Sequence, residues 1–415
     1  MIPSDEIRKG YEKKMVAQLF RSSAISLALA WAGVAAVAEP GASLEPTAGT
    51  AGSVSGVHAQ TNAAVCRTVA FLGGSITEMD GYRPLVMKAL RERYPAVAFT
   101  EIAAGLSSTC SDAGAFRLDE AVLSRGLPDL LVVEFSVNDD QDGHFGRARC
   151  IRGLEGVLRR MRLANPTCAM VVGLTVNKSQ FDLLRRGGVP IAYAAHTAVA
   201  ERYGAALADI GSALVASAAA GGLDWAGYRD CHPSPEGCRF AANVFESAIA
   251  RVFDPYGEAV PQPLPEPVDA ASYFRSAPVP STAVTAEDGG WRHSVPEWDA
   301  IPGHVRKNYR NGAIWWCDRA GAALDISFEG TALAAFMTAG PDSGDLEVSV
   351  DGGSPHRVRL RADYDDLHYP YVEILADDLP RGRHRVRLRV VSAARKDREG
   401  TAVRLHRIYS NGGAE

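Results

Sequence analysis

The sequence predicts an α/β fold followed by a C-terminal antiparallel β-sandwich. Over residues 66–253, apolar strand-like runs alternate with amphipathic helical stretches. A Pro-rich stretch, Pro255–Pro267, then interrupts this pattern, and residues 271–412 consist of short runs separated by turn signals. Strands that alternate with helices predict a parallel sheet covered on both faces, a three-layer α/β/α domain. Short strands at regular spacing predict a sandwich.

Within residues 66–253, five apolar runs predict strands and four amphipathic stretches predict helices. Open parallel sheets carry their active sites beyond the carboxyl ends of the strands, so catalytic candidates should come directly after strands. The predicted strands are Val69–Leu72, Val97–Ala104, Leu130–Val137, Ala169–Val176 and Ala206–Ile210, and the predicted helices are Tyr82–Tyr94, Ile151–Leu163, Ile191–Tyr203 and Arg239–Phe253.

The second region shows the alternation typical of half-buried strands. Its clearest example is Arg383–Val390, in which basic and largely apolar residues take turns. We expect this segment to present one face to a core and the other to solvent. The predicted strands are Leu324–Phe328, Leu333–Met337, Leu346–Val350, Arg357–Arg361, Tyr371–Leu375, Arg383–Val391 and Val403–Tyr409.

The N-terminus has the parts of a secretory signal peptide. Three basic residues, Lys13, Lys14 and Arg21, precede the uncharged, mostly small-apolar run Ala24–Ala38, which ends in Ala-Val-Ala. This run falls short of the roughly 20 residues that a membrane-spanning helix needs, although a membrane anchor is the alternative. We expect residues 1–38 to be a signal peptide, and the mature protein to be secreted or periplasmic and free of the membrane.

Two further segments lack the pattern of a folded element. Residues 39–65 are rich in Ala, Gly, Ser, Thr and Pro, and we expect a disordered spacer there. Residues 254–270 contain the Pro-rich stretch and predict a stiff linker. The net charge of −5 is small for 415 residues, whereas nucleic-acid binders normally carry a basic surplus. We therefore expect no nucleic-acid partner.

Three residues at strand ends are candidates for catalysis. Ser75, in Gly-Gly-Ser-Ile-Thr, follows the first strand at a turn that glycines make tight, and the following helix N-terminus favours negative charge. Gly105 ends the second strand and lets a backbone N–H approach a substrate. Asn138 closes the third strand and carries an amide that can donate to an oxyanion. Taken singly, each is also ordinary turn chemistry.

A serine nucleophile needs a general base within hydrogen-bond reach. Residues 66–253 contain three histidines. His196 falls within a predicted helix and we expect it to be packed or on the surface; His144 lies in a polar loop. His232 lies in Asp-Cys-His-Pro, a loop of the kind that presents a base, with proline fixing the backbone. We therefore expect His232 to act on Ser75.

The ordered set Ser75, Gly105, Asn138 and His232 resembles the four named residues of the SGNH (GDSL-like) hydrolases. Gly74 stands where the commonest family pattern has Asp, so the chain looks like a Gly-Gly-Ser variant. The resemblance implies a flavodoxin-like fold and ester hydrolysis through an acyl-enzyme. It also implies an oxyanion hole made of the Ser75 and Gly105 N–H groups and the Asn138 side chain. We expect no cofactor and no metal.

The acid of the catalytic triad is where the chain departs most from the family. The family's Asp usually lies three residues before the His, and Arg229 occupies that position. Asp230, two residues before His232, is the nearest candidate to orient the imidazole. A Ser–His dyad supported by a backbone carbonyl, or an acid from elsewhere such as Asp224, are the alternatives.

None of the seven cysteines shows the paired spacing of a zinc site. In an oxidising compartment disulfides become the default. Cys231 and Cys238 bracket a short loop that contains His232, and a bridge between them would make this loop rigid. Small buried cysteines are also common core residues, which is the alternative.

Acidic residues gather around Asn138. Glu134 lies inside an apolar strand, where a charge must be paired or hydrogen-bonded, and we favour a structural pairing. Asp139, Asp140 and Asp142 follow directly, and we favour a solvated acidic loop over a cation site.

The second region suggests the substrate. An exported esterase joined to a β-sandwich resembles carbohydrate-active enzymes, which favours the deacetylation of a poly- or oligosaccharide. A lipid or aryl esterase, a thioesterase, an acyltransferase and a non-catalytic glycan-binding protein are the alternatives. Aromatic side chains of this region are candidates for a sugar-stacking surface or for the core: Trp291, Trp298, Trp315, Trp316, Tyr364, Tyr369 and Tyr371.

Overall fold

The structure is a computed structural model, and it describes residues 65–413 except 288, 307–308, 363–365 and 397. The predicted signal peptide, and the predicted spacer up to residue 64, lie outside the described residues. Among the residues described, no helix has the length and apolar character needed to cross a membrane.

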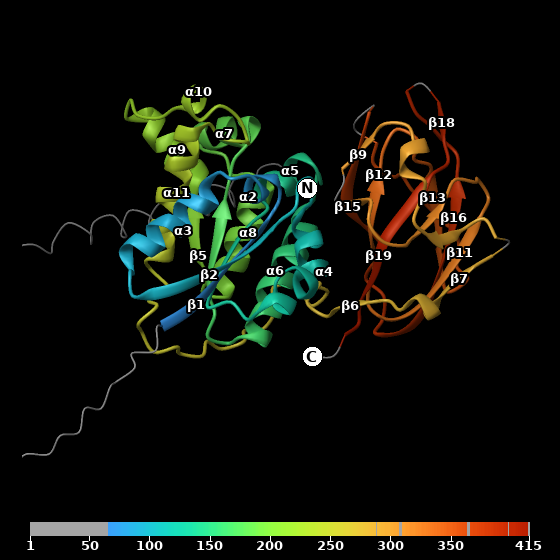
Figure 1. Cartoon of the computed structure of the whole chain (residues 1–415), viewed down its shortest axis with the longest axis horizontal. Helices are drawn as coiled ribbons and strands as arrows, with labels where there is room; N and C mark the ends of the chain where they lie inside the picture. Colours follow the sequence, from blue (N-terminus) through green and yellow to red (C-terminus); the bar gives the residue numbers. More distant parts are fainter. Residues whose placement is uncertain (1–64, 288, 307–308, 363–365, 397, 414–415) are drawn as a thin grey trace, which may run out of the picture. The chain divides into compact units, whose positions relative to one another are not determined.

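A parallel sheet forms the centre of the first region (Figure 1). Its strand order is β2-β1-β3-β4-β5, and every neighbouring pair is parallel. This is the order of flavodoxin-like folds, so the predicted α/β class is confirmed. The strands are β1 (Val65–Gly73), β2 (Val97–Gly105), β3 (Leu130–Glu134), β4 (Ala169–Leu174) and β5 (Ala206–Asp209).

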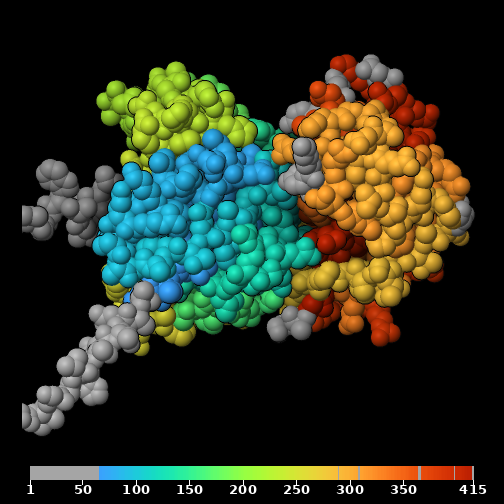
Figure 2. Space-filling view, viewed as in Figure 1, coloured from blue at the N-terminus to red at the C-terminus, as the bar shows by residue number. Residues whose placement is uncertain are grey.

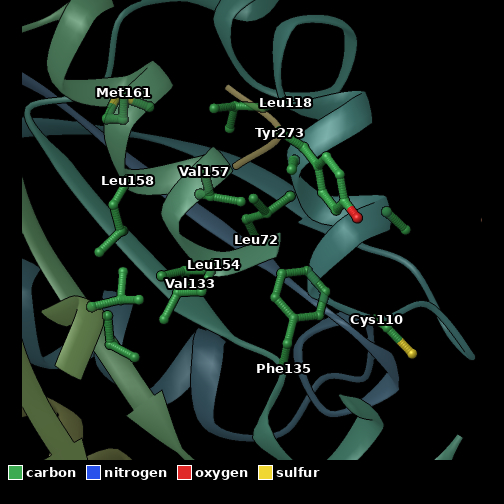
Figure 3. Packing of buried hydrophobic residues seen from close by; sticks show 14 of the residues in the cluster. Leu72, Cys110, Leu118, Val133, Phe135, Leu154, Val157, Leu158, Met161 and Tyr273 are labelled. Atoms are coloured by element: carbon green, nitrogen blue, oxygen red, sulfur yellow. The ribbon is translucent and has the colours of Figure 1, made fainter. Parts of the chain in front are cut away.

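Helices cover both faces of this sheet, because side chains along each strand alternate between two cores. Leu72 and Val133 pack on one side against α4 (Ser111–Ala121), α6 (Arg147–Ala164) and α8 (Ile191–Arg202). Figure 3 shows Leu72 and Val133 together with Leu154 and Leu158 of α6. Phe71 and Val132 pack on the other side against α3 (Tyr82–Arg93), α9 (Ile210–Ala219) and α11 (Pro235–Ile249).

Short helices lie at the carboxyl ends of the strands. α2 (Ser75–Glu78) follows β1, and α5 (Ser136–Gln141) follows β3. α7 (Lys178–Arg185) follows β4, and α10 (Trp225–Tyr228) lies shortly before α11. In the space-filling view, the yellow-green segment around α9 and α10 projects at the top (Figure 2). The loop that carries His232 leaves this projection directly after α10.

Several elements differ from the sequence prediction, and among them helices α7 and α9 were not predicted. The third strand ends at Glu134 and not at Val137, because Phe135 leaves the extended conformation and Ser136 starts a helix. Val137 is apolar because it packs in the core from that helix. Helix α4 was not predicted, since seven of its eleven residues are buried and it shows little of the polar-apolar periodicity of a surface helix.

The second region is an antiparallel β-sandwich, as predicted. One sheet has the order β8-β10-β19-β12-β15-β9, with β6 beside β19, and the other has the order β14-β13-β16-β11-β7. Between the strands that the structure describes in this region, pairing is antiparallel apart from β9 with β15. The strands are β6 (Ser276–Pro278), β7 (Val284–Ala286), β8 (Arg292–Ser294), β9 (His304–Val305), β10 (Ile314–Cys317), β11 (Ala323–Gly330), β12 (Leu333–Ala339), β13 (Asp345–Val350), β14 (His356–Val358), β15 (Leu367–Ala376), β16 (Gly382–Val391) and β19 (Val403–Asn411), and β17 (Ala393–Ala394) pairs with β18 (Glu399–Gly400).

Strand β16 shows how sequence alternation builds this core. Its apolar residues Val386 and Leu388 are fully buried between the two sheets. Its arginines point outward, where Arg385 and Arg387 pair with Asp325 on β11 at 3.0 Å. The predicted division of this strand into an apolar and a basic face is therefore confirmed.

Glu155 on α6 fastens the chain that leads into the sandwich. Its carboxylate is fully buried and accepts hydrogen bonds from the Val268 and Asp269 N–H groups, at 2.5 and 2.9 Å. The Ser272 hydroxyl donates to the same carboxylate at 2.6 Å, and the Tyr203 hydroxyl at 2.9 Å. The segment after the Pro-rich stretch is thus bound to α6 through one buried acid.

Replacing Glu155 by Ala should lower the free energy of unfolding by about 3 kcal/mol or more, because several buried donors lose their acceptor. Urea denaturation of the full chain measures this change. Glu201→Ala, at an exposed position of α8, is the matched control and should cost less than about 0.5 kcal/mol. Equal stability of the two variants would contradict the assignment of Glu155 as an anchor.

Candidate active site

Glycines let neighbouring groups approach the turn that carries Ser75 closely. Ser75 is the first residue of α2, directly after β1, and it is half-buried. A Cβ atom on Gly74 would lie 2.2 Å from Asn138 Oδ1, and a Cβ on Gly105 would lie 2.3 Å from the Glu78 backbone nitrogen. Only glycine at these positions lets the Asn138 side chain and strand β2 approach the turn. The first contact explains why this chain has Gly74 before its serine.

His232 lies in hydrogen-bond contact with Ser75. Its Nε2 atom is 2.7 Å from Ser75 Oγ, although the two residues are 157 positions apart in the chain. The His232 side chain is exposed, and its loop is closed by a hydrogen bond from the Ser234 N–H to the Tyr228 carbonyl at 2.9 Å. A hydroxyl and an imidazole at this distance form the contact that a nucleophile and its general base require.

The structure places Asp230 on the backbone of His232 and not on its ring. Asp230 Oδ1 accepts from the His232 N–H at 2.6 Å, and the Arg229 guanidinium donates to the His232 carbonyl at 2.9 Å. The other candidate acid, Asp224, caps helix α10. Within the described part of the chain, the partner of His232 Nδ1 is the Cys231 sulfur at 3.7 Å. Sequence analysis did not assign this position to Cys231.

Asn138 lies against the same turn, from helix α5. It is 3% exposed, and its Nδ2 donates to Asp142 Oδ2 at 2.6 Å. A side-chain amide carries two N–H donors, so one remains after this bond. Asp142 follows Asn138 by four residues, a spacing that brings side chains together on a helix. That spacing is the signal from which the sequence could have revealed this contact.

Residues 71–240 match the sequence model of the GDSL-like Lipase/Acylhydrolase family. This segment is a GDSL-like hydrolase domain. The match places the protein among hydrolases of ester bonds. A search of curated proteins found no match.

Two solved structures resemble this chain over both of its regions. Each is of a two-domain esterase described as active on acetylated mannans, one of them co-crystallised with mannopentaose. The TM-scores are 0.67 and 0.64, and the identities are 20% and 22%. The alignments cover 85% and 84% of this chain and 92% of each matched chain. At this identity the likeness shows the fold, a GDSL-like domain followed by a β-rich region.

The other two histidines of the GDSL-like domain, His144 and His196, have other surroundings than Ser75. His196 is fully buried, as expected for a packed residue, and its Nε2 is 2.9 Å from Asp139 Oδ2. Asp139 also accepts from the Ser111 N–H and hydroxyl, at 2.8 and 2.7 Å. Asp139 is therefore buried and hydrogen-bonded, and the prediction that it belongs to a solvated acidic loop was wrong. His144 is exposed in its loop.

The two cysteines that bracket His232 are both free thiols, so the candidate disulfide is not formed in this structure. Cys238 is buried and its sulfur lies 3.6 Å from the Pro233 carbonyl. Cys231 is half-buried, and burial raises the pKa of its thiol.

Most of the aromatic candidates for sugar stacking belong to cores. Tyr364 lies outside the described residues. Trp315 and Trp316 are half-buried, and the Arg292 guanidinium covers the Trp316 ring at 3.7 Å from its centroid. The buried members of the set are Trp291, Trp298, Tyr369 and Tyr371.

Glu134 lies beneath the turn that carries Ser75. Its carboxylate is fully buried and accepts from the Thr77 hydroxyl at 2.6 Å and from the Thr175 hydroxyl at 3.1 Å. Backbone N–H groups of Gly74 and Thr77 also hydrogen-bond to it. Burial raises the pKa of Glu134 to about 7, against the lowering effect of these hydrogen bonds. The prediction that Glu134 has a structural role, with its charge hydrogen-bonded, is therefore confirmed.

The raised pKa of Glu134 makes stability depend on pH. The ordinary pKa is 4.5, so the folded state holds this proton more tightly than the unfolded chain. The contribution of Glu134 to the free energy of unfolding is then greatest below pH 4.5 and is lost as the pH rises to about 7.

Glu134→Gln removes this titration. The free energy of unfolding of the wild type minus that of the variant should fall by about 3 kcal/mol as the pH rises from 4.5 to about 7. Urea denaturation at a series of pH values measures this difference. A difference that stays constant with pH would contradict the raised pKa.

Proposed function

We propose that this protein is an exported serine esterase that removes acetyl groups from poly- or oligosaccharides through an acyl-enzyme. The observation that carries the proposal is the 2.7 Å contact between His232 Nε2 and Ser75 Oγ in a GDSL-like domain. Both residues lie beyond the carboxyl ends of the parallel strands, where such sheets place their active sites.

In the proposed reaction His232 is the general base. Its Nε2 accepts the Ser75 hydroxyl proton while Oγ attacks the ester carbonyl carbon. The bond to the sugar oxygen then breaks, and His232 returns the proton to that oxygen. This leaves an acetyl group on Ser75. Water activated by the same imidazole releases acetate and restores the serine.

The negative charge that develops on the carbonyl oxygen needs preorganised donors. We propose the backbone N–H groups of Ser75 and Gly105 and the second amide N–H of Asn138. The bond from Asn138 Nδ2 to Asp142 holds this side chain in place and uses one of its two N–H groups. The close approach of Asn138 and of Gly105 to the turn supports this assignment.

The carbohydrate substrate is inferred from the two-region architecture. The matched two-domain esterase is described as active on acetylated mannans, and its likeness to this chain extends over the sandwich. We also propose that the sandwich helps to bind glycan. In support, a cavity of about 380 Å³ is lined by Leu106, next to Gly105, and by the rings of Tyr309, Phe336 and Tyr409. A concave, partly aromatic surface with a few polar groups is typical of ligand sites.

We also propose that the protein is exported to the periplasm or out of the cell. This proposal rests on the signal-peptide pattern of residues 1–38 and on the extracellular nature of polysaccharide substrates.

Substrate comparison tests the activity directly. The purified protein should release acetate from acetylated mannan and xylan oligosaccharides and should hydrolyse aryl esters more slowly as the acyl chain lengthens. Ser75→Ala should abolish this turnover, whereas Ser124→Ala, an exposed serine on the same domain, should retain it. Acetate release is followed by an enzyme-coupled assay. Preference for long acyl chains would indicate a lipid esterase. Transfer of the acetyl group to an added sugar would indicate a transferase, and binding without turnover would indicate a non-catalytic protein.

A pair of variants separates the oxyanion hole from the triad acid. Asn138→Ala should lower kcat by about 10²–10³ with little change in KM, since its amide donates in the transition state. Asp230→Ala should lower kcat by less than about tenfold, because this carboxylate contacts the backbone of His232 and not the ring. Loss of a true triad acid costs about 10⁴. A loss of that size in Asp230→Ala, measured by steady-state kinetics, would restore Asp230 to the triad.

A further inference from the structure

We propose that Asp230, Cys231 and His232 bind a thiophilic divalent cation such as Zn²⁺, and that an occupied site stops hydrolysis. A carboxylate oxygen, a sulfur and an imidazole nitrogen from these consecutive residues lie within 4.8 Å of one another. These are the three donor types that proteins use for zinc. The site would inhibit the enzyme and takes no part in the reaction. Its inhibitory effect rests on the proposed function, whereas its binding of the cation does not.

The distance between two of the donors fits zinc without movement of the backbone. Cys231 Sγ and His232 Nδ1 are 3.7 Å apart. A tetrahedral zinc with Zn–S of about 2.3 Å and Zn–N of about 2.0–2.1 Å holds its sulfur and nitrogen about 3.6 Å apart. One cation therefore fits between these atoms, where it replaces the thiol proton and releases it to solvent.

The Asp230 carboxylate completes the set from an exposed position. Its side chain is 55% exposed, and one oxygen accepts from the His232 N–H. The Arg229 guanidinium, 58% exposed, lies 3.7 Å from the other oxygen and has to turn away when the cation binds. Because His232 is exposed as well, water has access to the fourth position. Three protein donors with an open fourth position form a reversible site and not a closed structural one.

Cation binding at Nδ1 removes the general base. A neutral imidazole carries one N–H, and a nitrogen that coordinates a metal offers its lone pair. With Nδ1 on the cation, the ring proton must lie on Nε2, the atom 2.7 Å from Ser75 Oγ. Nε2 then donates to the serine and cannot accept its proton. Hydrolysis stops although the Ser75–His232 contact persists.

Binding is tested without reference to activity, in the full-length Ser75→Ala variant. Zn²⁺ is titrated against a chromophoric chelator, and Co²⁺ is used to detect thiolate coordination by its near-ultraviolet charge-transfer band. Adding Cys231→Ser, or separately Asp230→Asn, should weaken the tightest Zn²⁺ equivalent at least about tenfold, and Cys231→Ser should remove the cobalt band. Cys238→Ser, the neighbouring thiol outside the cluster, is the matched control and should bind as the parent does. Equal affinity in the Cys231→Ser variant, with folding verified by circular dichroism, would overturn the site.

Inhibition is tested in the chain with Ser75 intact. Zn²⁺ should inhibit acetyl ester hydrolysis at the concentrations at which it binds, and a chelator should restore the rate. In Cys231→Ser, inhibition should require at least about tenfold more Zn²⁺, compared with that variant's own metal-free rate. Binding with an unchanged rate would overturn the inhibitory role and leave the proposed esterase intact. A metal-free protein that hydrolyses no ester would instead refute the proposed function, while the binding experiment still decides the site.

Discussion

The position of Ser75, the proposed nucleophile, depends on one buried carboxylate. Glu134 ends β3, and its bonds to Thr77 on α2 and to Thr175 after β4 tie the turn of Ser75 to two neighbouring strands. A glycine turn alone is flexible, because glycine loses more conformational freedom on folding than any other residue. The buried acid supplies the fixed acceptor for this turn, and burial raises its pKa as a consequence. Once the turn is fixed, the absence of a side chain at Gly74 brings Asn138 to it.

The fold was predictable where burial leaves a regular pattern in the sequence. The parallel strands are short apolar runs, and β16 alternates between basic and largely apolar residues, so both regions were assigned correctly. The errors arose where an element is buried on most sides, or where a buried strand passes into a buried helix without a polar residue between them. Seven of the eleven residues of helix α4 are buried, so its polar-apolar periodicity is weak. The apolar run of β3 continues through Phe135 and Val137 after the strand has ended. Periodicity cannot mark a boundary between two buried elements.

The candidate site divides in the same way. Ser75, Gly105, Asn138 and His232 became candidates because chain order and residue type suffice to single them out, and few histidines compete. Side-chain direction is not encoded at that level. Asp230 and Cys231 are the two residues before His232, yet the carboxylate turns to the backbone N–H while the thiol faces the ring. Distinguishing these two arrangements requires the loop conformation, in which Arg229 adopts a positive φ of 90°.

The contact of Asp230 with the His232 backbone and the proposed cation site are two consequences of this loop. A carboxylate hydrogen-bonded to Nδ1 would hold that proton, stabilise the imidazolium formed in the reaction and leave no lone pair for a metal. A thiol is only a weak hydrogen-bond partner, so it gives up that stabilisation. The His232 ring is exposed, so water has access to it. The same weak contact leaves Nδ1 open to a cation for which sulfur and imidazole are preferred ligands. If the proposed function and the proposed cation site both hold, the weak contact at Nδ1 that lowers catalytic power is also the contact that makes the enzyme sensitive to thiophilic metal ions.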